Sequence, residues 1–296
     1  MSTPPVTYPE ASAEGIPFEE PRPPAHDPDN PPWGLGGAVG ILILSFALMI
    51  LMQVCFLIPY TLWRGVRLDG FAEFAVKDAG AIFMQIASIV PAHLLTLVAA
   101  WLVVTRVGKY PFLKMLGWDW GEELTFWRCV GLAALLYAAG WSVLKFSGPT
   151  DNALERLIQS SRSAALVTAF AATFTAPLVE ELVFRGLLYS SLRRLAGKVW
   201  AVAVVFLLFA LIHVPQYWPS YGVIVVILLL SFTLTMVRAR TGRLLPCFVI
   251  HLLFNGVQSV LIVLEPYIKS LVEKEPVPPS PGLLIELLTR FIGAAF

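Results

Sequence analysis

The chain has 296 residues, of which 57% are hydrophobic and only 14% are charged, and its formal net charge is +1. Soluble globular domains are roughly 45–50% apolar and about 25% charged, so this composition excludes an ordinary soluble protein. The near-neutral charge gives no basis for a nucleic-acid partner. The composition predicts an integral, multi-pass membrane protein whose surroundings include membrane lipid.

The first part of the chain, residues 1–33, has a different composition from the rest. Its first 32 residues hold ten prolines and six acidic residues. Such a segment buries too little apolar surface to offset the entropy of folding. We therefore expect a disordered tail.

Seven apolar segments follow, and most approach or exceed the roughly 18–20 residues that cross a bilayer as a helix. They cover residues 35–60, 79–105, 127–146, 164–192, 198–213, 221–238 and 244–264. Backbone groups in lipid must pair within their own segment, which favours helices. The predicted fold is an all-α, polytopic membrane bundle of about seven transmembrane helices, with residues 34–124 forming an N-terminal group.

Two shorter helices are expected outside these spans. Residues 148–163 are predicted to form a short surface helix between the third and fourth segments. Residues 266–296 begin with a proline-rich linker and continue as an amphipathic helix at the membrane interface.

Six basic residues occupy the later loops on one side, and none lies in the 214–220 loop, so the charge pattern favours an N-terminus on the inside. These six are Arg193, Arg194, Lys198, Arg238, Arg240 and Arg243.

Ionisable and amide side chains interrupt three of the apolar segments. The fourth carries Glu180, Glu181 and Arg185, the fifth ends near His213, and the seventh carries His251 and Asn255; these positions are read directly from the sequence. A charged side chain at the bilayer centre costs roughly 2.5–3.5 kcal/mol on insertion scales. Such residues usually face a bundle interior or a cavity and mark function.

Helical geometry assigns different roles to the two adjacent glutamates. Glu181 and Arg185 are four residues apart, so they lie on one face and can form an ion pair. Glu180 points elsewhere and is left without an intrahelical partner. The spacing therefore predicts that Glu181 and Arg185 support the site, whereas Glu180 is free for chemistry.

The fourth and fifth segments should form an antiparallel hairpin that turns near Gly197. Glu180 and His213 are then equally far from the turn, so they lie at the same depth and can meet. We expect both to share one polar cavity with His251 and Asn255. His93, on the second segment, is expected to be an interhelical residue outside that cavity.

Three short motifs carry a family resemblance. "EELVFR" spans residues 180–185, "FALIH" spans 209–213 and places Phe209 four residues before His213, and "HLLFN" spans 251–255. In this order, on apolar segments, they resemble the CPBP family of intramembrane proteases. That family includes the Rce1-type CAAX prenyl endopeptidases and relatives linked to bacteriocin immunity. The resemblance covers roughly residues 125–264 and suggests a protease core at 125–265.

The resemblance implies roles for individual residues. Glu180 and His213 would activate the water that attacks a peptide carbonyl, and His251 with Asn255 would stabilise the oxyanion. Glu181, Arg185 and Phe209 would support the site. A zinc ion held by Glu180, His213 and His251 stays open beside a metal-free mechanism.

The implied substrate is a membrane-associated protein or peptide cut near its C-terminus, with a prenylated CAAX protein as one candidate. The implied setting is a bacterial cytoplasmic membrane. Two other classes of function stay open on the residues alone. Buried Glu and His side chains also serve proton-coupled transporters, and the same motifs could persist in a non-catalytic scaffold or immunity protein.

Overall fold

The computed structural model describes residues 31–147 and 162–273, with side chains described as far as residue 264. Every regular element within these two ranges is helical. In chain order they are α1 (Leu35–Trp63), η1 (Leu68–Gly70), α2 (Phe71–Lys77), α3 (Ala79–Ala87), α4 (Ile89–Thr105), α5 (Phe112–Met115), α6 (Phe126–Ser147), α8 (Arg162–Phe170), η2 (Ala171–Thr175), α9 (Ala176–Glu180), η3 (Glu181–Leu188), α10 (Tyr189–Tyr217), α11 (Tyr221–Thr241) and α12 (Leu245–Glu273). Most of the predicted tail, the surface helix before α8 and most of the predicted C-terminal region lie outside the described residues.

Six helical stretches in the described residues are long and apolar enough to cross a membrane. They include α1, α6, α11, the α3–α4 stretch Ala79–Thr105, and Leu245–Leu264 of α12. The sixth runs from Arg162 to Tyr217 and has 56 residues, enough for two crossings. The protein is thus an integral membrane protein with the predicted polytopic helical fold.

The sixth stretch is the predicted hairpin. Its helical path breaks at Gly197, whose backbone angles are φ 81° and ψ 173°. Only glycine adopts this region readily, since a Cβ there clashes with the backbone. The second arm of α10 returns along the first, which brings residues of η3 and α10 into one core with α1 and α4. The predicted turn at Gly197 is confirmed.

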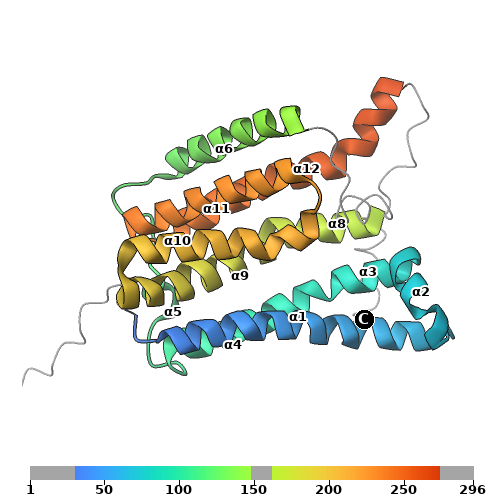
Figure 1. Cartoon of the computed structure of the whole chain (residues 1–296), viewed down its shortest axis with the longest axis horizontal. Helices are drawn as coiled ribbons and strands as arrows, with labels where there is room; N and C mark the ends of the chain where they lie inside the picture. The colour runs from blue at the N-terminus through green and yellow to red at the C-terminus, as the bar shows by residue number, and fades with distance from the viewer. Residues whose placement is uncertain (1–30, 148–161, 274–296) are drawn as a thin grey trace, which may run out of the picture.

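Figure 1 shows how the bundle is arranged around this hairpin. Helices α1 and α4 lie along one edge and α6 lies along the opposite edge, with α9 to α12 between them. One hydrophobic core joins α1 and α4 to the hairpin, and a second joins α6, α11 and α12. The hairpin and its neighbours α11 and α12 therefore lie at the centre of the bundle.

The first arm of the hairpin contains two π-helical segments, η2 and η3. Proline accounts for part of this irregularity: Pro177 has no N–H to donate to the preceding turn. The widened turns leave carbonyls that accept hydrogen bonds from other elements. Asn255 donates to the Ala172 carbonyl, and Arg238 donates to the Arg185 carbonyl. π-Segments of this kind occur frequently at functional sites.

Candidate active site

Glu180 faces both predicted histidines. Its Oε1 lies 4.0 Å from Nε2 of His213, and its Oε2 lies 3.7 Å from Nε2 of His251. The Glu180 side chain keeps 24% of its accessible surface, whereas His251 keeps only 2%. The hairpin and α12 therefore bring one partly open carboxylate against two imidazoles, as the sequence predicted.

The hydrogen bonds of the two histidines fix which ring nitrogen faces Glu180. Nδ1 of His213 lies 2.7 Å from the carbonyl oxygen of Phe209, which can only accept, so Nδ1 carries the proton. Nδ1 of His251 lies 2.8 Å from Oε1 of Glu181. That carboxylate is paired with an arginine and also acts as an acceptor. Both rings thus present Nε2 to the cavity, where it can accept or carry a catalytic proton.

Glu181 is held by an ion pair inside the protein. Its Oε1 lies 3.0 Å from Nη1 of Arg185, and both side chains are fully buried. This is the predicted pairing, and it leaves Glu180 without an arginine partner among the described residues. Glu181 has a further contact that the sequence did not predict, since the same oxygen accepts from His251.

Arg185 is surrounded by partners from two neighbouring segments. Its Nε lies 3.3 Å from the Thr235 hydroxyl, and its Nη2 lies 2.9 Å from the Ser231 hydroxyl. Its guanidinium also lies 4.3 Å from the ring centroid of Phe209, a cation–π distance. The Phe209 ring in turn lies 4.6 Å from the His213 ring. Phe209 therefore lies between the structural ion pair and His213, whereas His251 contacts that pair directly.

Ser231 and Thr235 were missed at the sequence level. They are four residues apart on α11, and both are fully buried. The available signal was a hydroxyl pair at helical spacing in an apolar segment. Such residues are common in membrane helices, so the sequence offered no reason to single them out.

Asn255 also lies at the site, but one of its bonds is structural. Its Nδ2 donates to the Ala172 carbonyl at 2.9 Å. In a π turn this carbonyl would bond the N–H of residue 177, which is a proline and has none. An amide carries two N–H groups, and among the described residues Asn255 uses one of them, so the other can serve a second partner.

These side chains line a cavity of about 460 Å³. Its polar wall includes Glu180, His213, His251 and Asn255, together with Gln216, Tyr217 and Gln258, which the sequence did not predict. Its apolar wall comes partly from α1 and α3, through residues such as Leu42, Phe46, Met49 and Ile86. The cavity thus pairs a polar end with a wide apolar surface.

The expected position of His93 is wrong, because this residue lines the same cavity. The helical break before α4 and the packing of α4 on the hairpin bring it there. Its Nδ1 lies 2.9 Å from the Thr175 hydroxyl. This is an interhelical hydrogen bond of the kind the sequence predicted for His93.

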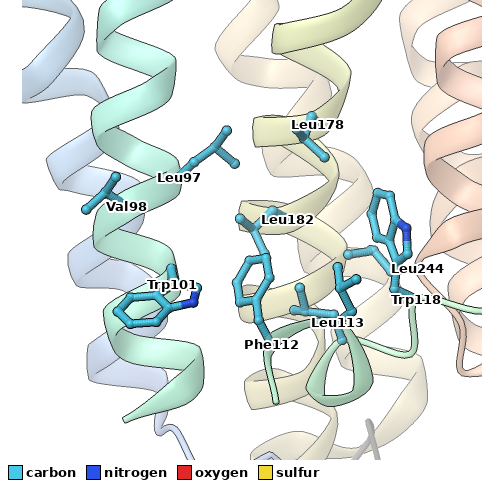
Figure 2. A pocket seen from close by; sticks show the side chains of 10 residues that line it. Leu97, Val98, Trp101, Phe112, Leu113, Trp118, Leu178, Leu182 and Leu244 are labelled. Atoms are coloured by element: carbon cyan, nitrogen blue, oxygen red, sulfur yellow. The ribbon is translucent and has the colours of Figure 1, made fainter. Parts of the chain in front are cut away.

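A second hollow, of about 490 Å³, lies between α4, α5 and the first arm of the hairpin. Figure 2 shows the side chains around it, which include Leu97, Trp101, Phe112, Leu178 and Leu182. None of the described residues that line it has a titratable side chain. This hollow therefore offers no group for acid–base chemistry, unlike the cavity at Glu180.

Within the described ranges, no group of three or more His, Cys, Asp and Glu side chains is arranged to hold a metal ion. The three residues suggested as zinc ligands do converge. Glu180 approaches each imidazole, at 4.0 Å for His213 and 3.7 Å for His251.

Fold and site together define an integral membrane protein with a carboxylate–imidazole centre inside its helical bundle. Residues 162–257 match the family described as type II CAAX prenyl endopeptidase Rce1-like. The match is to a family of CAAX-type membrane proteases, and the matched segment contains every predicted site residue. Comparisons with curated proteins and with solved structures gave no match.

Proposed function

We propose that this protein is an intramembrane endopeptidase that hydrolyses a peptide bond near the C-terminus of a membrane-associated protein or peptide. The observation that carries the proposal is the spacing of Glu180 from the two Nε2 atoms, at 4.0 and 3.7 Å. These separations exceed a direct hydrogen bond, and a water molecule beside the carboxylate and an imidazole could bond to both.

In the proposed reaction, Glu180 and His213 activate that water. Its oxygen attacks the peptide carbonyl carbon while its proton passes to the Glu180 carboxylate or to Nε2 of His213. The C–N bond then breaks, and the same proton is delivered to the leaving amine nitrogen. The products are a new amine and a new carboxylic acid, which keeps the second proton of the water and then loses it to the amine or to solvent.

His251 and Asn255 are the proposed oxyanion donors. Asn255 can offer the N–H that does not bond Ala172. His251 can donate from Nε2 only as an imidazolium, because its Nδ1 proton is directed to Glu181. Donors held in place before reaction are usually the largest catalytic term.

The cavity walls support a membrane-associated substrate. The polar end holds the reacting groups, and the side chains from α1 and α3 provide an apolar surface for a lipid-like or hydrophobic segment. A prenylated CAAX protein is one substrate of this type. We further propose that the N-terminus faces the inside of a bacterial cytoplasmic membrane.

Zinc bound by Glu180, His213 and His251 would supply Lewis-acid activation of the water. The side-chain arrangement leads us to favour activation by Glu180 and His213 alone. Activity retained after dialysis against a chelator and lost in Glu180→Ala is the expected result. Activity that disappears on chelation and returns with zinc would contradict the metal-free form.

The decisive experiment for the class of function uses purified protein in detergent with hydrophobic and prenylated peptides. Cleavage by the wild-type protein, absent in Glu180→Ala, supports the protease. Proton-coupled uptake by reconstituted vesicles without cleavage would instead indicate a transporter. Neither cleavage nor transport, with unchanged folding of Glu180→Ala, would indicate a scaffold.

A further inference from the structure

Helix α11 contributes to none of the three recognised motifs, yet it contacts the centre of the site. The Ser231 and Thr235 hydroxyls lie 2.9 and 3.3 Å from the guanidinium nitrogens of Arg185. The Ser231 carbonyl lies 3.1 Å from Nη2 of the same arginine. One face of α11 is therefore built around the Arg185 side chain.

The direction of these hydrogen bonds is fixed. The Thr235 hydroxyl donates its only proton to the Ser231 carbonyl at 2.7 Å, and the Ser231 hydroxyl donates its proton to the Phe206 carbonyl at 3.0 Å. Both oxygens are then left to accept from the guanidinium, which can only donate. These contacts hold the plane of the Arg185 guanidinium in one orientation.

That orientation determines how Arg185 meets Glu181. A single nitrogen, Nη1, contacts a single oxygen, Oε1, and the same oxygen accepts from His251. The other oxygen, Oε2, is buried and has no hydrogen-bond partner among the described residues. Guanidinium and carboxylate groups otherwise favour two parallel bonds. A guanidinium freed from α11 would turn to take both oxygens and compete with His251.

We propose that Ser231 and Thr235 are positioning residues that hold Nδ1 of His251 as the protonated nitrogen and leave Nε2 facing Glu180. They act through Arg185 and then Glu181. The effect on catalysis rests on the proposed peptidase function, whereas the effect on the histidine tautomer does not.

The variants remove the hydroxyls with little change in side-chain volume. Ser231→Ala and Thr235→Val are made singly and together, and Thr235→Ser restores a hydroxyl at the second position. Thr96→Val is the matched control. Thr96 is a buried threonine of α4 whose hydroxyl donates to the Ala92 carbonyl at 2.9 Å, and it does not line the cavity.

The first readout is the ¹⁵N NMR signature of the His251 ring in detergent-solubilised full-length protein. The chain has only four histidines, so selective ¹⁵N-histidine labelling gives few signals, and His251→Gln assigns the relevant ones. At a pH high enough for the ring to be neutral, we expect Nδ1–H in the wild-type protein and in Thr96→Val. In the double variant the proton should redistribute towards Nε2, and Thr235→Ser should behave like wild type. An unchanged tautomer in the double variant, or in both single variants if the double variant does not fold, overturns the proposal.

The second readout is peptide hydrolysis. A ring released from Glu181 no longer holds Nε2 in place for the oxyanion, so kcat should fall, by up to about 100-fold for a misplacement near 1 Å, and KM should stay close to wild type. Thr235→Ser should recover most of the loss. A shifted tautomer with unchanged kcat would overturn the catalytic part of the proposal. A shifted tautomer in a protein without any peptidase activity would support the positioning and refute the proposed function instead.

Discussion

Glu180 on α9 and His213 on α10 lie opposite each other on the two arms of one hairpin, with Oε1 and Nε2 4.0 Å apart. Gly197 lies midway between them in the sequence, so each arm places its residue at the same depth. The contact therefore depends on the turn as much as on the two side chains. It is the geometric basis of the proposed water activation.

The adjacent glutamates should respond differently to the same substitution. Glu180→Ala is expected to abolish hydrolysis and leave thermal stability near wild type, because Glu180 has no arginine partner among the described residues. Glu181→Ala leaves Arg185 as a buried, uncompensated charge, which typically costs about 3–5 kcal/mol. Thermal unfolding in detergent measures the stability of both variants. An equal loss of stability in the two variants would refute this division of roles.

Asn255 and Ser259 offer a matched pair on α12. Both donate to carbonyls of the first hairpin arm, Asn255 to Ala172 and Ser259 to Ala169, at 2.9 and 3.2 Å. Each alanine variant should therefore lose about 1 kcal/mol of stability. Only Asn255→Ala should also lower kcat, by about 100-fold if its free N–H is an oxyanion donor. Steady-state kinetics on both variants measures the two kcat values. An equal kcat would show that the only role of Asn255 is its structural hydrogen bond to Ala172.

The hairpin turn depends on glycine at residue 197. A Cβ at Gly197 would meet no atom within 4 Å, so the effect of Gly197→Ala comes from its positive φ alone. Such strain costs about 1–3 kcal/mol. Gly40 in α1 is the control, because it also has open space around it but lies within a regular helix. Gly40→Ala should be neutral or slightly stabilising. Equal melting temperatures for the two variants would argue against a strained turn.

Much of this arrangement could be predicted from the sequence because it depends on helical spacing. The Glu181–Arg185 pair follows from a four-residue separation, and the Glu180–His213 contact follows from equal distances to Gly197. Neither spacing depends on how the helices pack in detail, and the structure confirms both contacts.

Contacts set by packing between distant helices could not be predicted in the same way. The Arg185 bonds to Ser231 and Thr235 depend on how α11 rotates against the hairpin. The bond from Asn255 to Ala172 depends on a π-helical turn, which ordinary helical periodicity does not reveal. His93 reaches the cavity through the packing of α4, and no local pattern distinguishes it from other interhelical histidines.

A double-mutant cycle on Glu180 and His213 tests the central claim most directly. The measured quantity is kcat/KM for cleavage of one hydrophobic peptide by wild type, Glu180→Gln, His213→Asn and the double variant. When two groups act as one unit, the effects of substituting them are strongly non-additive. We therefore expect each single variant to lose nearly as much activity as the double variant. Single losses that multiply in the double variant, or wild-type activity in either single variant, would contradict joint activation of water by Glu180 and His213.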